Sequence, residues 1–272
     1  MRLLITGGTG TLGSNLIRRC LRDNLFSEIV CYSRDELKQF DLNNELADSR
    51  VKFVIGDVKD RLRLFEACKG VDYIVHAAAL KHVASGENHP WEVIQTNLLG
   101  TKNVVDAANE VGAKMVLVST DKAVAPANLY GCTKMAAEAL TLNGGQRVVR
   151  YGNVFGSRGS ILHKFKEWTA RGHTFKITDL RMTRFVLTVD EAIDLVLETL
   201  NMPPMSLYIP TLPAMRIVDL AKAFDADAVI EEIGAFPGEK LHESLSETQT
   251  SDKARRMTVA EIRRLIDDTL GV

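Results

Sequence analysis

The first half of the chain alternates short apolar runs with longer stretches of helical period. The apolar runs are rich in β-branched residues and scarcely alternate with polar ones, which is typical of parallel strands buried on both faces. Between them, residues 12–21 and 90–111 carry their apolar side chains on one helical face. Strands that alternate with helices predict an α/β fold, a Rossmann-like doubly wound parallel sheet with right-handed crossovers. The predicted strands are 3–5, 29–32, 51–55, 71–75 and 115–118.

The second half of the chain is more polar and is interrupted more often by Gly and Pro. Residues 148–151 and 207–209 predict two further strands, and 188–200 predicts a helix capped by its first threonine. The stretch 242–256 has few apolar residues and predicts a loop or a lid. After it, a capping box at 258–261 opens a last predicted helix.

These elements predict two unequal parts. We expect an NADP-binding Rossmann domain over residues 1–152, to which 186–209 return. Residues 153–272 would form mainly a smaller C-terminal substrate-binding lobe.

Composition narrows the class of protein. The 272 residues include 34 Lys and Arg against 35 Asp and Glu, with 46% apolar and 25% charged residues, which is typical of a globular protein and excludes disordered and fibrous classes. The chain has no basic tract, no apolar run of about 18 residues and no signal-peptide pattern, so we expect no nucleic-acid partner and no membrane span. Four scattered cysteines without metal-ligand spacing predict reduced thiols, no metal site and a cytoplasmic location.

A glycine-rich motif follows the first predicted strand and opens the first predicted helix. Residues 6–13 read TGGTGTLG, which satisfies both GxGxxG and GxxGxxG. Glycines there let the backbone turn tightly and approach a pyrophosphate at the helix N-terminus. The motif predicts a bound dinucleotide in contact with Gly7, Thr9, Gly10, Thr11, Leu12 and Gly13.

The end of the second predicted strand indicates which dinucleotide binds. An NAD enzyme would place Asp or Glu there to bind the ribose 2′-hydroxyl. Ser33, Arg34 and Lys38 instead offer a hydroxyl and two cations for a 2′-phosphate, which favours NADP. Asp35 and Glu36 lie in the same stretch and leave NAD open as the alternative.

Two further strand ends carry residues suited to the cofactor. Asp57 and Val58 follow the third strand, where Asp57 could accept a hydrogen bond from the adenine amine. Small side chains after the fourth strand would let the cofactor lie flat against the backbone. We interpret His76, directly before them, as a core histidine. The small residues are Ala77, Ala78 and Ala79.

The most informative cluster begins where the fifth predicted strand ends, the edge at which open α/β sheets bind ligands. Residues 119–122 read STDK, and Tyr130 and Lys134 follow with the i,i+4 spacing of one helix face. A nearby ammonium lowers the pKa of a tyrosine, so this pair could remove a hydroxyl proton while hydride leaves the same carbon.

With these motifs the chain resembles the extended short-chain dehydrogenases/reductases, specifically the configuration-inverting UDP-N-acetylglucosamine 4,6-dehydratases. The resemblance extends to about Glu243. The Asp-Lys pair at 121–122 is what the dehydratases add, and Tyr130 separates them from the membrane-bound retaining enzymes, which tend to carry methionine there. The matching stretches are TGGTGTLG, YSRDELK, IGDVKD, HAAALKHV, TNLLGTKNV, STDKAVAPANLYGCTK, RYGNVFGSRGS, ITDLRMTRFVLTVDEA and PGEKLHE.

The resemblance implies a redox cycle that regenerates its cofactor. Tyr130, with Thr120 beside it, would deprotonate the C4 hydroxyl while hydride passes to NADP+. Lys122, neutral in a desolvated site, could then remove the C5 proton, and a protonated Asp121 would protonate the departing C6 hydroxyl. Hydride return to C6 would give a 6-deoxy-4-keto sugar nucleotide inverted at C5. The division of acid and base roles between Asp121 and Lys122 stays open.

The resemblance also implies partners and binding residues. It implies a UDP-N-acetylhexosamine substrate, a homo-oligomer, and a place in surface-polysaccharide or flagellin glycan biosynthesis. Thr96 would join the cofactor site. The implied substrate-binding residues are Lys81, Asn153, Arg158 and Arg184.

The chain departs from the family pattern in two notable places. Phe236 replaces an arginine in a region that closes over the nucleotide, and the segment 140–146 is short. Two other functions stay open. A UDP-sugar 4-epimerase or 4-ketoreductase would need only Tyr130 and Lys134, and a non-catalytic NADP-binding protein would need neither.

Overall fold

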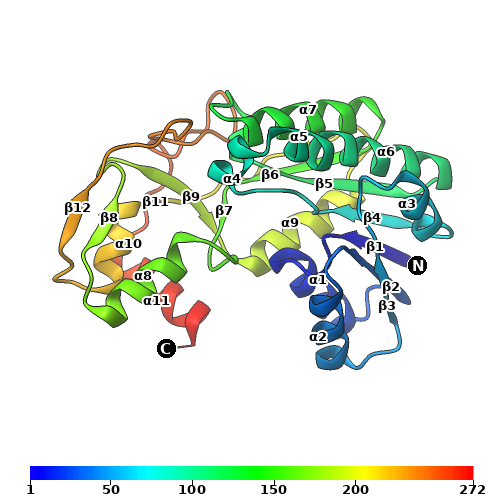
Figure 1. The fold of residues 1–272 in the computed structure, drawn as a ribbon, viewed down its shortest axis with the longest axis horizontal. Coiled ribbons are helices and arrows are strands. Elements are labelled where there is room, and N and C mark those ends of the chain that lie inside the picture. Colours follow the sequence, from blue (N-terminus) through cyan, green and yellow to red (C-terminus); the bar gives the residue numbers. More distant parts are fainter. Residues whose placement is uncertain (272) are drawn as a thin grey trace.

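The computed structural model describes residues 1–271 and contains a seven-stranded parallel sheet (Figure 1). The strand order is β10-β6-β5-β4-β1-β2-β3, so the order reverses between β1 and β4, where open α/β sheets bind their ligands. The predicted fold class is confirmed. The strands are β1 (Arg2–Thr6), β2 (Glu28–Ser33), β3 (Val51–Ile55), β4 (Tyr73–His76), β5 (Lys114–Thr120), β6 (Arg147–Tyr151) and β10 (Leu207–Tyr208).

Helices cover both faces of this sheet because successive strand residues point to opposite sides. Leu3 and Ile5 pack with α1 and α9 on one face, whereas Leu4 packs with α3, α6 and α7 on the other. Figure 1 shows α6 and α7 above the sheet and α1 and α2 below it. The helices are α1 (Thr11–Arg22), α2 (Glu36–Leu46), α3 (Arg61–Cys68), α6 (Gly100–Val111), α7 (Leu129–Asn143) and α9 (Val189–Asn201).

The helix predicted over 90–111 is not uniform. It consists of α5 (Pro90–Val93), a π-helical segment (Ile94–Leu99) and α6 in succession, preceded by α4 (Val83–Asn88). The π-helical segment holds Asn97, whose side chain accepts from the backbone N–H of Leu80 at 2.8 Å and donates to its carbonyl at 3.0 Å. This helix is therefore tied to the chain that follows β4.

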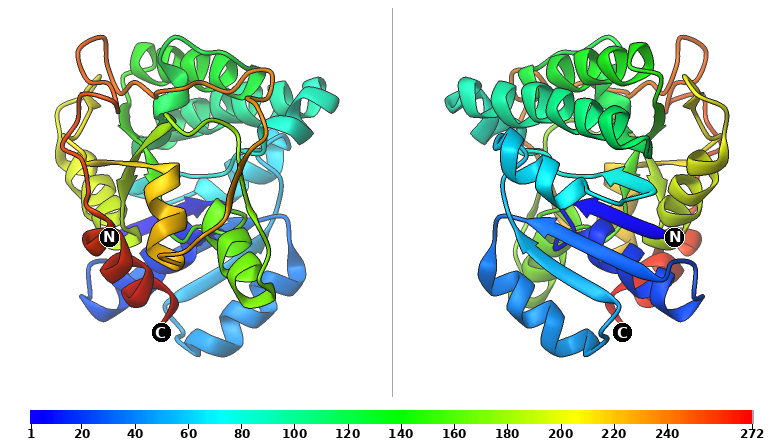
Figure 2. Two further views of the ribbon diagram at one scale, coloured as in Figure 1. Left: turned by 90° about the vertical axis from the view of Figure 1, so that its left-hand side faces the viewer. Right: turned by 90° about the vertical axis from the view of Figure 1, so that its right-hand side faces the viewer.

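A second lobe is built from short elements around its own core. Its strands form a three-stranded sheet, β11-β9-β7, and a two-stranded one, β12-β8. Phe165 packs edge-on against Phe175 with ring centroids 5.1 Å apart, and Figure 2 shows α10 between α8 and α11. The sequence pattern predicted the last helix but not most of the other elements. They are β7 (Asn153–Val154), α8 (Ile161–Arg171), β8 (Phe175–Ile177), β9 (Thr183–Leu187), β11 (Ala214–Arg216), α10 (Ile217–Phe224), β12 (Ile230–Glu232) and α11 (Val259–Leu270).

Residues 242–256 form a loop that is fastened to the body of the protein. Leu245 is fully buried, and its carbonyl accepts from Arg150 Nη1 at 2.8 Å. The Ser251 hydroxyl lies 2.6 Å from the Thr183 hydroxyl on β9. These contacts place the loop against the carboxyl edge of the sheet. Within residues 1–271, no helix is long and apolar enough to cross a membrane.

Candidate active site

The glycine motif forms a tight turn between β1 and α1. Gly7 has φ +70°, and a Cβ built on it would lie 2.9 Å from the backbone nitrogen of Ala78. A Cβ on Gly13 would lie 2.6 Å from the carbonyl oxygen of Gly7. Side chains would fill this turn, so only glycines leave its backbone open toward the N-terminus of α1. The turn fits a dinucleotide pyrophosphate.

The residues predicted to choose between NADP and NAD lie at the end of β2. Ser33 Oγ accepts from Gln39 Nε2 at 2.9 Å, and Lys38 pairs with Asp35, the residue that caps α2. Arg34 is 52% exposed, with Nη1 3.6 Å from Asp57 Oδ2. Lys38 is equally exposed, but Arg34 has the looser contact with its carboxylate and is therefore the freer cation for a 2′-phosphate.

Other predicted cofactor residues line the same edge. Asp57 Oδ1 accepts from the backbone N–H of Lys59 at 3.0 Å, and Val58 is buried beside Gly100. Thr96 is buried, and its hydroxyl has no hydrogen-bond partner among the described residues. An unpartnered hydroxyl here is suited to a bound polar group.

His76 belongs to the core, as interpreted. Its Nδ1 lies 2.6 Å from the Thr6 hydroxyl and its Nε2 3.0 Å from the Thr101 hydroxyl. Burial lowers the pKa of His76 to about 3, so the ring is neutral at pH 7. Residues 1–271 contain no cluster of His, Cys, Asp and Glu that could hold a metal ion.

The residues predicted to be catalytic meet at the end of β5. The strand leads into a 3-10 turn (Asp121–Ala123), and α7 begins a few residues later behind its N-cap. Lys122 Nζ lies 3.1 Å from Asp121 Oδ1, and the Thr120 hydroxyl donates to the same oxygen at 3.0 Å. The structure thus brings an acid, an ammonium and a hydroxyl together at the carboxyl edge of the sheet.

Tyr130 and Lys134 share one face of α7, but they do not interact as predicted. Lys134 Nζ donates to the Val118 carbonyl at 2.7 Å, and burial lowers the pKa of Lys134 to about 8. Burial raises the pKa of Tyr130 to about 12, and the cation that opposes this rise is Lys122. The prediction that Lys134 lowers the tyrosine pKa is therefore wrong in this structure.

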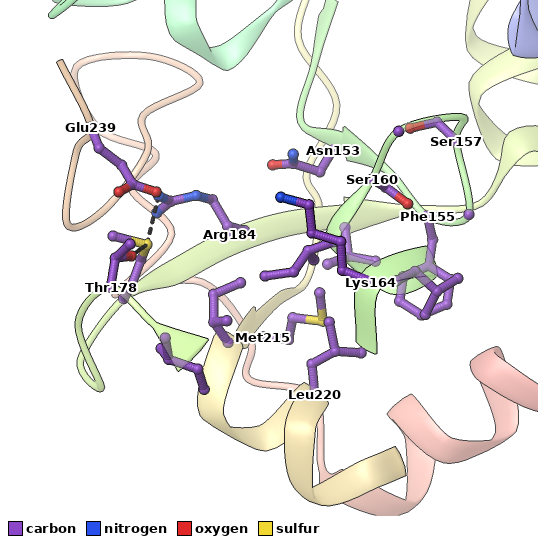
Figure 3. Close-up of a pocket in the computed structure, with 18 of the residues that line it drawn as sticks. Asn153, Phe155, Ser157, Ser160, Lys164, Thr178, Arg184, Met215, Leu220 and Glu239 are labelled. Atoms are coloured by element: carbon purple, nitrogen blue, oxygen red, sulfur yellow. Dashed lines mark hydrogen bonds and ion pairs between the residues drawn. The ribbon is translucent and has the colours of Figure 1, made fainter. Parts of the chain in front are cut away.

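The second lobe supplies a cavity of about 560 Å³ (Figure 3). Its lining residue Arg184 has Nε 3.9 Å from Glu243 Oε1, and Glu243 pairs with Lys122. Lys81, Asn153 and Arg184, three of the four predicted substrate-binding residues, line this lobe pocket. Arg158 does not. Its Nη1 donates to the Thr9 carbonyl at 3.0 Å and its backbone N–H to the Thr11 hydroxyl at 3.1 Å, so it lies on the glycine turn. Its own carbonyl accepts from Lys81 Nζ at 2.9 Å.

Comparison with known proteins identifies the family of the chain. The profile of a family described as "Polysaccharide biosynthesis protein" matches residues 3–264. The chain belongs to this family. A UDP-N-acetylglucosamine 4,6-dehydratase (inverting) of Campylobacter jejuni is 41% identical over 261 residues, which cover 92% of this chain and 78% of the relative.

Two further proteins show how broad the similarity is. A UDP-glucose 4-epimerase of Rickettsia akari is 40% identical over 270 residues, 93% of this chain and 79% of the relative. The X-ray structure of Pen from Bacillus thuringiensis superposes with a TM-score of 0.92 at 31% identity and covers 98% of this chain and 97% of that one. Sequence similarity alone therefore does not separate dehydratase from epimerase.

Sequence reasoning missed one member of the charged cluster at the end of β5. Glu243 is 2% exposed, and its Oε1 lies 3.0 Å from Lys122 Nζ. Glu243 is the last residue of the PGEKLHE stretch, whose match to the family pattern was the one sequence signal for it. Nothing in the local sequence indicates that this stretch packs against the end of β5.

Glu243 also corrects the expectation for Lys122. Burial alone would lower the pKa of Lys122, but Asp121 and Glu243 together raise it above the ordinary lysine value. The expectation of a neutral Lys122 is therefore wrong for the resting site, because the carboxyl groups of Asp121 and Glu243 lie 3.1 Å and 3.0 Å from its ammonium. Burial raises the pKa of Asp121, which favours its protonated form.

Proposed function

We propose that this enzyme is an NADP-dependent, C5-inverting 4,6-dehydratase of a UDP-N-acetylhexosamine, serving surface-polysaccharide or flagellin glycan biosynthesis. The observation that carries the proposal is the ion pair near Tyr130 between the buried Asp121 and the partly buried Lys122. An epimerase needs only to oxidise and reduce C4, which leaves this pair without a task. The Campylobacter relative, similar over 92% of this chain, has a matching name.

The reaction requires a base at C4 and an acid–base pair at C5 and C6. The glycine turn and Arg34 would hold the cofactor, which would supply a hydride acceptor for C4 and a hydride donor for C6. Tyr130 takes the C4 hydroxyl proton, helped by the positive charge of Lys122. The resulting ketone acidifies C5–H, and Asp121 protonates the C6 oxygen, which leaves as water.

The lobe pocket suits a nucleoside diphosphate. Lys81, Lys164 and Arg184 supply cations along its wall, and α8 starts there behind Ser160, whose side chain makes no capping hydrogen bond. Cations and a helix N-terminus are the groups that bind phosphates. Met215 and Leu220 supply apolar surface for the rest of the ligand (Figure 3).

We also infer a division of labour along the chain. Residues 1–152, with 186–209, would bind the cofactor. Residues 153–272 would mainly bind the substrate. The lobe pocket, lined largely by residues 153–239, supports this division.

The test is incubation with UDP-N-acetylglucosamine in D2O, followed by mass spectrometry and NMR. A dehydratase gives a product lighter by one water, with deuterium at C5 and an inverted C5 configuration. Asp121→Asn should slow that elimination by about 10²–10⁴-fold, the usual contribution of a positioned acid. It should leave C4 oxidation, seen as absorbance at 340 nm, in place.

A UDP-sugar 4-epimerase is the second candidate because the Rickettsia relative carries that name. It predicts a product of unchanged mass with C4 inverted, and an Asp121→Asn variant that keeps most of its rate. Together, these two results would contradict the proposed dehydratase activity and support the epimerase activity.

A further inference from the structure

Two buried carboxylates face a single ammonium at the end of β5. Asp121 is 0% exposed and Glu243 is 2% exposed. Lys122 Nζ lies 3.1 Å from Asp121 Oδ1 and 3.0 Å from Glu243 Oε1. The second oxygen of each carboxyl group makes no hydrogen bond with the described residues.

The surroundings decide which carboxyl group keeps its proton. Burial favours the neutral form of a carboxyl group unless enough cations lie close to it, so the number of cations near each group decides. Glu243 faces two more cations, with Arg184 Nε 3.9 Å from Oε1 and Lys240 Nζ 3.7 Å from Oε2. Among the described residues, Asp121 pairs with one cation, Lys122, and accepts from the Thr120 hydroxyl, and the negative charge of Glu243 opposes its ionisation.

These surroundings favour a resting cluster of neutral Asp121, a Lys122 ammonium and a Glu243 carboxylate. The titration preferences agree: burial raises the pKa of Asp121. Burial acts in the same direction on Glu243, but Lys122 and Arg184 outweigh it and lower the pKa of Glu243 below its usual value. An ammonium has no lone pair, so Lys122 can act as a base only if it first gives up a proton.

We propose that Glu243 is a positioning residue that accepts the proton Lys122 must release before Lys122 can take the C5 proton of the sugar. This inference rests on the proposed function. In the elimination the C5–H electrons form the C5–C6 double bond and the C6–O electrons leave on oxygen. The C5 proton goes to Lys122 Nζ as Lys122 passes one proton to Glu243. Asp121 gives its proton to the leaving oxygen, which departs as water.

The transfer keeps the charge of the buried cluster constant. One proton enters from C5 and one leaves with the water. The cluster changes from neutral Asp121 and ionised Glu243 to the reverse, with Lys122 cationic before and after. A buried site favours such an exchange because no unpaired charge is created in it.

The loop that carries Glu243 is held in a defined position. The backbone N–H of Glu243 donates to Ser251 Oγ at 2.9 Å, and Ser251 donates back from its own N–H to the Glu243 carbonyl at 2.8 Å. Lys240 Nζ also donates to the Val124 carbonyl at 2.5 Å, just after the 3-10 turn. These bonds fix the distance between Glu243 and Lys122.

The test compares Glu243→Gln with wild type, using UDP-N-acetylglucosamine and added NADP+. We expect C4 oxidation, read at 340 nm in a single turnover, to stay within about threefold, and dehydrated product to form about 10²-fold more slowly. Elimination by the variant should rise with pH, tenfold per unit, where wild type is flat, because solvent must then remove the Lys122 proton. Glu243→Asp should restore the flat profile and part of the rate.

Glu247→Gln is the matched control, because Glu247 is exposed on the same loop and should behave as wild type. A Glu243→Gln variant with a wild-type elimination rate, with a pH profile parallel to wild type, or with equal loss of both half-reactions would overturn the inference. If Glu243→Gln melts well below wild type, the pH profile of elimination by Glu243→Asp is the test: a flat profile supports the inference, and a rate that rises tenfold per pH unit overturns it. If wild type itself releases no water from the substrate, the proposed function fails instead.

Discussion

The two parts of the molecule reach the active site in different ways. In the seven-stranded sheet, the functional residues follow directly after strands, as Gly7 follows β1 and Asp121 follows β5. In the second lobe and its loop, Arg184 and Glu243 reach the same region through contacts between distant segments. The comparison teaches that parallel strands position the residues of the proposed cofactor side locally, whereas the proposed substrate side depends on long-range packing.

Removing the Tyr130 hydroxyl should have the largest effect. Tyr130→Phe deletes the proposed C4 base, so both the 340 nm signal and product formation should fall by about 10²–10⁴-fold. This loss would separate it from Asp121→Asn, which keeps the first half-reaction. Tyr208→Phe, on the edge strand β10, is the control with wild-type rates. Retained C4 oxidation in Tyr130→Phe would remove Tyr130 from its proposed role.

The same contrast explains what the sequence could predict of the fold. Leu3, Leu4 and Ile5 are all buried because both sheet faces are covered, and that double burial shows in the sequence as an unbroken apolar run. Strands such as β7 and β8 have only two or three residues and pair with distant partners. Runs that short carry no periodicity, so their pairing could not be inferred.

The candidate site divides in the same way. The spacing of Asp121, Lys122 and Tyr130 is local, so sequence motifs indicated it. The protonation of Lys122 depends on the nearby Glu243. The orientation of the Lys134 side chain depends on its hydrogen bond to the Val118 carbonyl. Both are products of tertiary packing. The expectation for Lys134 came from local spacing and that for Lys122 from the family resemblance, and neither holds in this structure.

Breaking the link between the two parts should destabilise the whole protein. Glu138 on α7 and Arg150 on β6 form a largely buried pair, with Arg150 Nη2 2.5 Å from Glu138 Oε2. Arg150 also holds the Leu245 carbonyl in the loop that carries Glu243. Glu138→Gln leaves the Arg150 charge without its partner and should lower the free energy of unfolding by about 3–5 kcal/mol.

Urea unfolding measures this loss, and Glu110→Gln, a change at an exposed position of α6, is the control. If Glu138→Gln unfolds at the wild-type urea concentration, the pair does not couple the sheet to the loop. If Glu138→Gln is less stable but forms product at the wild-type rate, the pair contributes to folding stability and not to the position of Glu243.

Acid should lower the stability of the protein through His76, which is buried at the end of β4 in the seven-stranded sheet. Burial lowers its pKa to about 3 in the folded protein, whereas an unfolded histidine titrates near about 6.5. Below that pH the unfolded chain takes up a proton that the folded chain refuses, so stability falls as pH drops from about 6.5 toward 3. From pH 6.5 to pH 5 the contribution of His76 is about 2 kcal/mol.

Urea unfolding of His76→Gln at the two pH values checks this sign. The variant is expected to be less stable at neutral pH, since it disturbs bonds to Thr6 and Thr101, but to lose less stability on acidification. His89→Gln, at an exposed position, should keep the wild-type pH dependence. Equal slopes for His76→Gln and wild type would mean that His76 is not the group responsible.

The smallest effect should come from the cofactor-selecting end of β2. Arg34 is half exposed and Lys38 is already paired with Asp35, so Arg34 carries most of the proposed preference for a 2′-phosphate. Arg34→Ala removes a charge-assisted hydrogen bond worth about 1.5–3 kcal/mol, which should weaken NADP binding by about 10- to 100-fold and leave NAD binding nearly unchanged. Titration calorimetry with both dinucleotides measures the difference, and Arg63→Ala, at an exposed position of α3, is the control.

Equal losses of affinity for NADP and NAD in Arg34→Ala would show that Arg34 contacts a part of the cofactor common to both. If the unmodified enzyme prefers NAD, the residue that selects the cofactor would be Asp35 or Glu36 and not Arg34. The end of β2 would then bind the ribose 2′-hydroxyl through an acidic residue, as in NAD enzymes.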